Sequence, residues 1–191
     1  KNISKTQNTN LESILILGAG PIGMLANILL RKDHDIETYV GATRSENSYK
    51  ADLVRETGSK YADLSKTSLL DLAKLVGGFD LIIEATGSSS LVYDSILSLN
   101  CNGVLGLTGI FLDDKPSMLG IDKLLLDIVL KNKTIVGIVN SNKSHFEAGV
   151  KDFNEINQKW PELLRKLITK EVLLDDYQQA FEKDREGIKI A

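Results

Sequence analysis

Apolar residues gather along this chain in short runs that alternate with longer amphipathic segments. Most of the short runs are rich in Ile, Leu and Val, and they predict strands over residues 13–17, 36–41, 60–62, 79–85, 103–107 and 134–139. The segments between them predict helices over residues 21–32, 49–57, 69–76, 91–98 and 122–130. This alternation predicts an α/β fold, a doubly wound parallel sheet of two three-strand halves between two layers of helices.

The two ends of the chain depart from this alternation. Residues 1–10 are almost entirely polar and predict a linker or a cut end, which leaves residues 11–191 as the folded domain. After Ser144 a helical pattern runs to Lys159, Trp160-Pro161 interrupts it, and it resumes over residues 175–183. A chain of 191 residues that is 42% apolar can bury one substantial core, so we expect one domain.

Three glycines stand at the junction of the first predicted strand and helix. Gly18, Gly20 and Gly23 supply G-x-G-x-x-G, the spacing of dinucleotide-binding turns. Gly18 permits a tight turn, Gly20 leaves bare backbone for a pyrophosphate, and Gly23 permits close packing of the helix. Pro21 suits the first helical turn, whose free N–H groups favour an anion. An ordinary tight turn is the alternative interpretation.

The end of the second predicted strand indicates which nucleotide is preferred. NAD-selective sites place Asp or Glu there to bind the ribose hydroxyls, whereas this chain has Ala42-Thr43-Arg44. A guanidinium without a neighbouring carboxylate suits a 2′-phosphate, so NADP is favoured. Glu46 lies two residues further on and leaves use of NAD possible, and Arg44 as a solvated loop cation is the alternative.

Composition excludes several classes of partner. A net charge of −3 without a basic run gives no basis for nucleic-acid binding. The longest apolar stretches are too short for a membrane span, and no signal sequence is evident. The single cysteine, Cys101, precludes an internal disulfide and a cysteine-rich zinc site. We therefore expect a cytoplasmic protein whose partners are small molecules rather than nucleic acid or membrane.

Residues that could perform catalysis are scarce. None of the five tyrosines is followed four residues later by lysine, which excludes the mechanism of short-chain dehydrogenases. His34 is expected in a solvated loop and His145 beside a helix cap, and neither has metal-ligand spacing. Cys101 is expected as a structural thiol in a turn, and Asp113-Asp114 as solvated loop charges. We expect no catalytic residue and no metal ligand in this chain.

Several segments resemble the medium-chain dehydrogenase superfamily and, within it, the archaeal glucose dehydrogenases. Segments shared with the superfamily are Gly-Ala-Gly-Pro-Ile-Gly at residues 18–23, Phe-Asp-Leu-Ile-Ile-Glu-Ala-Thr-Gly at 79–87, and those at 102–107 and 132–140. Segments closer to glucose dehydrogenases are Val139-Asn140, His-Phe-Glu-Ala at residues 145–148, and the tail over 167–170 and 175–181. The resemblance covers nearly the whole chain.

The resemblance implies an activity that this chain does not perform alone. Members of this family oxidise the C1 hydroxyl of an aldose to a lactone, pass hydride to NADP or NAD, and use zinc to polarise the hydroxyl. Their zinc ligands belong to a GroES-like catalytic domain that would precede Lys1. We therefore expect an excised cofactor domain that binds NADP and does not turn over glucose by itself. We also expect it to associate as a dimer or tetramer through the strand over residues 134–139, at the edge of the sheet.

The resemblance also implies roles for individual residues. The residues expected at the pyrophosphate, with the three motif glycines, are Ala19, Gly20, Pro21 and Ile22. Those expected at the adenosine phosphate are Ala42, Thr43 and Arg44. Those expected at the nicotinamide are Leu107, Thr108, Gly109, Ile138, Val139 and Asn140, and Asn140 would also bind the sugar through its amide. Thr86 and Lys183 are further candidates for contact with the cofactor.

Two further interpretations remain open. The chain could be the cofactor domain of another medium-chain polyol or alcohol dehydrogenase, or a non-catalytic module that senses a dinucleotide. A methyltransferase could share the glycine turn, but it too would want an acidic residue where Ala42 stands.

Overall fold

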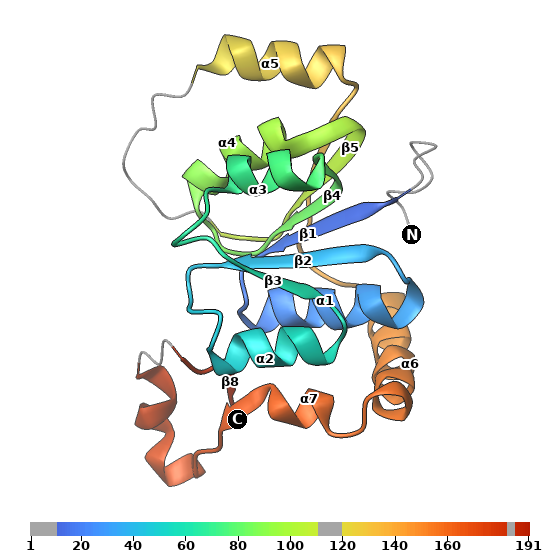
Figure 1. The fold of residues 1–191 in the computed structure, drawn as a ribbon. Coiled ribbons are helices and arrows are strands. Elements are labelled where there is room, and N and C mark those ends of the chain that lie inside the picture. The colour runs from blue at the N-terminus through green and yellow to red at the C-terminus, as the bar shows by residue number, and fades with distance from the viewer. Residues whose placement is uncertain (1–10, 111–119, 183–185) are drawn as a thin grey trace.

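The computed structural model describes residues 11–110, 120–182 and 186–191, which form a twisted sheet between helical layers (Figure 1). All six strands of the main sheet are parallel, in the order β3-β2-β1-β4-β5-β6. Their bounds are β1 Ser13–Leu17, β2 Glu37–Ala42, β3 Lys60–Asp63, β4 Phe79–Glu84, β5 Leu99–Leu107 and β6 Thr134–Gly137. The two halves meet between β1 and β4, so the expected doubly wound sheet is confirmed.

The helices divide into two layers because β1 is buried on both faces. Ile14 and Ile16 pack with α1 and α2 on one face, whereas Leu15 and Leu17 pack with α3 and α4 on the other. Figure 1 shows α1, α2, α6 and α7 on one side of the sheet and α3, α4 and α5 on the opposite side. The bounds are α1 Pro21–Asp33, α2 Tyr49–Glu56, α3 Leu69–Val76, α4 Ser89–Ser98, α5 Ile121–Leu130, α6 Lys143–Lys159 and α7 Leu163–Lys166.

Helix α6 begins and ends where the sequence indicates. The Asn142 side chain accepts a hydrogen bond from the backbone N–H of His145 at 3.1 Å, and Nδ1 of His145 accepts from the Asn142 N–H at 3.3 Å. The expected position of His145 beside a helix cap is confirmed. At the other end Trp160 follows the last helical residue, immediately before Pro161, which cannot donate a helical hydrogen bond.

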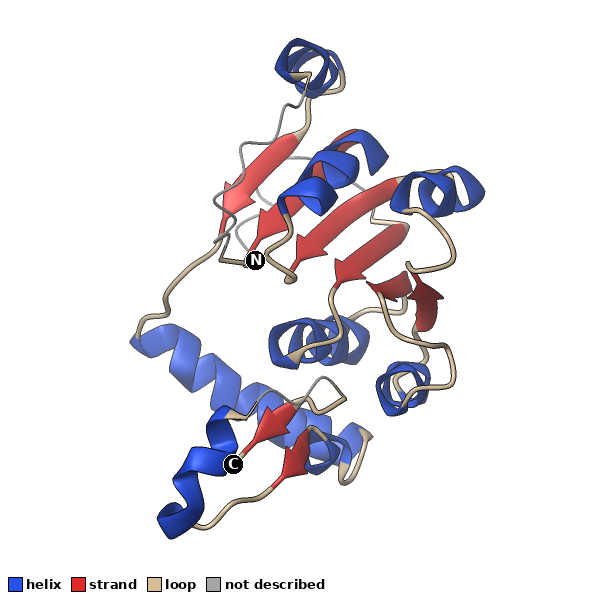
Figure 2. Ribbon diagram, turned by 90° about the vertical axis from the view of Figure 1, so that its left-hand side faces the viewer, coloured by secondary structure: helices blue, strands red, loops and turns tan. Residues whose placement is uncertain are grey.

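The C-terminal part contains two short strands that the sequence pattern missed, whereas the helical pattern expected over residues 175–183 is present as a 3₁₀ helix. Strands β7 Ile168–Lys170 and β8 Lys189–Ile190 form a separate parallel pair, and the 3₁₀ helix η2 Leu174–Phe181 lies between them in the chain. Figure 2 shows this small pair apart from the main sheet, beyond the layer that contains α6. Strands of two or three residues are too short for a repeating apolar pattern, and α7 has only four residues.

Strand β5 corrects one expectation. It begins at Leu99, four residues earlier than predicted, so Cys101 lies in a strand with an exposed side chain and not in a turn. The register with β4 shifts between Phe79 and Leu81, and Asn102 adopts a positive φ of 62°. This irregularity accommodates a polar Asn-Cys-Asn segment that, by sequence alone, favours a turn.

Asp80 connects three segments at the amino end of the sheet. Its buried carboxylate accepts hydrogen bonds from the N–H groups of Glu12 at 2.8 Å and Ser13 at 3.0 Å, and from the Asn100 amide at 2.9 Å. Burial acts to raise the pKa of Asp80, but the hydrogen bonds from Asn100, Glu12 and Ser13 outweigh it, and the net pKa lies below its ordinary value. The ionised form is therefore the one that the fold stabilises.

Replacing Asp80 with Asn should lower the free energy of unfolding by about 1–3 kcal/mol at pH 7, because an amide cannot accept all of these hydrogen bonds. A lowered pKa in the folded state gives stability that is complete above the unfolded pKa of about 3.9 and is lost as pH falls through the folded pKa. The difference between the two proteins should thus shrink on acidification. Urea unfolding between pH 7 and pH 3 measures it, with exposed Asp122→Asn as the control. A difference that grows towards pH 3 would contradict the assignment.

Candidate functional site

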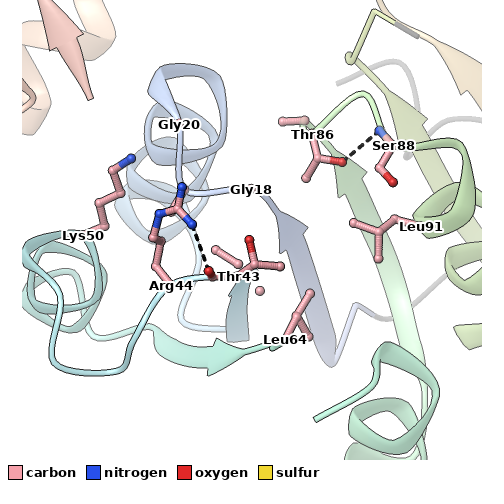
Figure 3. Close-up of a pocket in the computed structure, with 13 residues that line it drawn as sticks. Gly18, Gly20, Thr43, Arg44, Lys50, Leu64, Thr86, Ser88 and Leu91 are labelled. Carbon is pink, nitrogen blue, oxygen red and sulfur yellow. Dashed lines mark hydrogen bonds between the residues drawn. The ribbon is translucent and has the colours of Figure 1, made fainter. Parts of the chain in front are cut away.

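A cavity of about 380 Å³ lies beyond the carboxyl ends of β1, β2 and β4, at the point where the two halves of the sheet diverge (Figure 3). Open α/β sheets bind ligands at this position. The residues that line it are Gly18, Ala19, Gly20, Gly41, Ala42, Thr43, Arg44, Lys50, Leu64, Ala85, Thr86, Ser88 and Leu91. No carboxylate is among them.

The three motif glycines have different environments. Gly18 has a φ of +102°, and its N–H donates to the Gly41 carbonyl at 2.8 Å, which fixes the turn out of β1. A Cβ on Gly23 would lie 1.9 Å from the Gly18 carbonyl oxygen, so α1 is pressed against the turn itself more closely than against the sheet. A Cβ on Gly20 would meet nothing within 4 Å. Gly20 therefore borders open space that a ligand can occupy.

The amino end of α1 faces this space without a side-chain cap. Gly20 is the N-cap residue and Pro21 occupies the first helical position. Gly20 has no side chain to cap the helix, and no described residue caps it, so the first N–H groups and the positive end of the helix dipole are available to an anion. Ala19 lines the cavity, whereas the Ile22 side chain is 56% exposed.

Two cationic side chains, Arg44 after β2 and Lys50 on α2, also line the cavity. Arg44 donates from Nη1 to the Thr43 carbonyl at 3.1 Å, and its Nε lies 3.6 Å from a carboxylate oxygen of exposed Glu186. Lys50, in the first turn of α2, is only 8% exposed and also lines the cavity. Figure 3 shows both side chains extending towards the turn at Gly20. Glu46 is exposed and is not among the residues that line this cavity.

The sequence pattern did not indicate Lys50 as a residue of this cavity. A lysine in the first turn of the helix after the second strand could have suggested it. Its position at the same cavity as Arg44, however, depends on the path of the loop between β2 and α2. Two basic residues therefore line the cavity, where the sequence pattern indicated one.

The residues expected at the nicotinamide lie past the carboxyl ends of β5 and β6. Thr108 donates to the Glu84 carbonyl from its N–H at 2.9 Å and from its hydroxyl at 2.8 Å. The Ile138 N–H donates to the Leu107 carbonyl at 2.8 Å, just after β6 has ended at Gly137. The side chains that follow, Val139 and Asn140, are exposed, and Asn140 has a φ of +64°.

These residues form a second group on the same edge of the sheet. Leu107, Thr108, Gly109, Ile138, Val139 and Asn140 do not line the 380 Å³ cavity, whereas Thr86 does. Ser88 is the N-cap residue of α4, although its side chain makes no cap hydrogen bond. Lys183 and Asp113-Asp114 lie outside the described residues.

The described part of the chain contains neither a cluster of metal ligands nor a membrane-spanning helix. No group of three or more His, Cys, Asp or Glu side chains there is placed to hold a metal ion. No helix within residues 11–110, 120–182 and 186–191 is long and apolar enough to cross a membrane. His34 is exposed at the C-cap of α1, as expected for a solvated residue.

The sequence family described as "Glucose dehydrogenase C-terminus" matches residues 2–191. This chain belongs to that family. The glucose 1-dehydrogenase of Methanocella arvoryzae is 36% identical over 92% of this chain and 49% of its own length. Glucose 1-dehydrogenase 1 of Vulcanisaeta moutnovskia is 42% identical over 92% of this chain and 48% of its own length.

A solved structure supports the same assignment. The Haloferax mediterranei glucose dehydrogenase in complex with NADP, Zn and gluconolactone superposes with a TM-score of 0.87 at 29% identity. The superposition covers 99% of this chain and 52% of the other. The member of the glucose dehydrogenase family described here therefore spans about half the length of the relatives that it matches, and the expected family and Rossmann-type fold are confirmed.

The contrast between Gly20 and Gly23 predicts a difference in stability. Gly23→Ala should cost more than about 2 kcal/mol, because the new Cβ would overlap the Gly18 carbonyl oxygen. Gly20→Ala should cost about 1 kcal/mol or less, the usual penalty for alanine at an N-cap. Denaturant unfolding of the two variants beside the unmodified chain measures both values. Equal losses would mean that the turn does not have this geometry in solution.

Proposed function

We propose that this chain is the NADP-binding domain of a glucose 1-dehydrogenase, which oxidises the C1 hydroxyl of an aldose to a lactone. The observation that carries the proposal is the cavity at the switch point of the sheet, which among the described residues is lined by Arg44 and Lys50 and by no carboxylate. Membership of the glucose dehydrogenase family supports the substrate class. When bound, NADP would accept the hydride through its nicotinamide ring.

Each part of the nucleotide has residues suited to it. The pyrophosphate would lie over Gly20, where there is no Cβ, and accept hydrogen bonds from the first N–H groups of α1. The 2′-phosphate would lie between Arg44 and Lys50, whose charges it neutralises. The nicotinamide would lie at Thr108 and Ile138, beyond β5 and β6. Use of NAD remains compatible with this site, because its adenosine half needs only the ribose contacts.

The zinc site would lie in another part of the whole protein, because the described residues contain no cluster of metal ligands. We propose that zinc, which the Haloferax complex contains, is bound in a catalytic domain outside residues 11–191. We also propose a cytoplasmic location, since a single cysteine in 191 residues suits a reducing compartment.

Removing one cation should change cofactor preference. Arg44→Ala should weaken NADPH binding by about 10- to 100-fold, because a charge-assisted hydrogen bond to phosphate contributes roughly 1.5–3 kcal/mol, and should affect NADH far less. Lys50→Ala should act in the same direction. Calorimetric titration with both nucleotides measures the effect, with Arg55→Ala on α2 as a control, since Arg55 pairs with Asp52 instead. Equal weakening of NADPH and NADH would refute the phosphate assignment.

The sugar assignment depends on Asn140. In the whole protein Asn140→Ala should lower kcat/KM for glucose by at least about tenfold, because its amide would lose a hydroxyl partner on the substrate, while NADP affinity changes little. Steady-state kinetics together with cofactor titration separate the two effects. Asn157→Ala, exposed on α6, is the matched control. A whole protein inactive on every aldose tested would remove the substrate assignment and leave the other dehydrogenase or sensor interpretations.

The free edge of β6 supports a dimer. Among the described strands β6 stands at one end of the sheet, with Ile135 partly exposed, and the preceding helix α5 exposes Leu125, Leu126, Val129 and Leu130. We propose that two copies pair edge to edge along β6. Light scattering at micromolar concentrations should give twice the mass of one chain, and Ile135→Lys should shift it towards the monomer. A monomeric mass for the unmodified chain would disprove this arrangement.

A further inference from the structure

Glu84 is a fully buried carboxylate at the carboxyl end of β4, with 0% of the residue exposed. In the parallel register it stands between Leu17 of β1 and Leu107 of β5, at the centre of the ligand-binding edge. Its Oε1 accepts hydrogen bonds from the N–H groups of Thr86 at 2.7 Å and Gly87 at 3.0 Å, and from the Thr86 hydroxyl. One carboxylate oxygen therefore closes the turn between β4 and α4.

The main chain of the same residue holds a second turn. The Glu84 carbonyl accepts both the N–H and the hydroxyl of Thr108, which fixes the segment that leaves β5. The two turns are also packed directly on each other. A Cβ on Gly109 would lie 2.5 Å from the Gly87 nitrogen and 2.6 Å from Oε2 of Glu84, so no side chain fits between them.

The second carboxylate oxygen has no structural partner. Oε2 of Glu84 is buried against Gly109 and accepts no hydrogen bond from any described residue. Folded proteins satisfy nearly all buried polar atoms, so an unsatisfied one calls for an explanation in strain, in function or in a bound water or ion. A turn of this kind needs only one acceptor for its N–H groups, so a buried carboxylate is more than the fold requires.

We propose that Glu84 is a positioning residue that holds together the two turns against which the nicotinamide half of NADP binds. It acts through Thr86, Gly87 and Thr108 and touches no ligand itself. This inference rests on the proposed function, because the nicotinamide is assigned to the segment after β5. The adenosine half would lie at Arg44 and Lys50, beyond β2, and does not depend on Glu84.

Asp80 provides a matched control on the same strand. Like Glu84 it is a buried carboxylate that accepts hydrogen bonds from two backbone N–H groups, and its change to Asn is the same exchange of carboxylate for amide. It lies four residues earlier, about 13 Å away along an extended strand, at the edge opposite the cavity. The Asp80→Asn variant therefore separates the general effect of losing a buried carboxylate from the specific effect of losing Glu84.

The experiment compares two ligands on three proteins. The unmodified chain, Glu84→Gln and Asp80→Asn are titrated with NADPH and with adenosine 2′,5′-bisphosphate, which carries the 2′-phosphate but no nicotinamide. Glu84→Gln should weaken NADPH binding by about tenfold, as expected for loss of a charged acceptor, and change the bisphosphate affinity less than twofold. Asp80→Asn should change neither affinity more than twofold. Equal weakening of both ligands by Glu84→Gln, or no weakening of NADPH, would overturn the inference.

A second measurement uses the unmodified chain and does not require the variant to fold. The backbone amide resonances of Thr108 and Gly109, which do not line the 380 Å³ cavity, should shift when NADPH is added and stay in place with the bisphosphate. If the chain binds both ligands and these resonances respond to both or to neither, the role of Glu84 is wrong while the NADP site stands. If the chain binds neither ligand, the proposed function fails and this inference fails with it.

Discussion

Helix α1 packs tightly against the turn that ends β1. A Cβ on Gly23 would lie only 1.9 Å from the Gly18 carbonyl oxygen. Because no side chain fits there, α1 can begin immediately after the turn that ends β1. The helix then lies along β1, and its buried residues Met24 and Ile28 pack on Ile14 and Ile16. The open space beside Gly20 and the uncapped helix end both follow from this one contact. A longer turn would move the anion site away from the sheet.

Strand β1 transmits this constraint to the rest of the molecule. Its residues are buried on both faces, so it belongs to both halves of the core at once. Its neighbours β2 and β4 end at the same edge because all strands are parallel. The residues that follow those two strands, Arg44 on one side and Thr86 on the other, must therefore flank the turn at Gly18. The cavity results from the sheet topology combined with a close-packed turn.

The sequence predicted the parts of this arrangement that depend on local pattern. Six strands, the helix after Gly20 and the absence of an acid at Ala42 all follow from residue types at short spacing. It did not predict Lys50 at the cavity, because that contact joins segments separated by a loop whose path has no periodic signal. Glu84 was visible as part of a strand motif. The turn that its carbonyl holds could not be predicted, because that turn contains Thr108, which lies 24 residues later in the chain. Short-range patterns thus locate the edge of the sheet, whereas the contacts across that edge require the fold.

The two buried carboxylates of β4 show how the strand divides structural and functional demands. At the amino edge Asp80 accepts hydrogen bonds on both of its oxygens, from Glu12 and Ser13 on one and Asn100 on the other. At the carboxyl edge Glu84 uses one oxygen for the turn and leaves the other buried against Gly109. An unsatisfied buried oxygen lowers stability, so β4 carries at its carboxyl end a cost that it avoids at Asp80. This asymmetry along a single strand is what physical chemistry expects if one end serves the core and the other serves the proposed nicotinamide site.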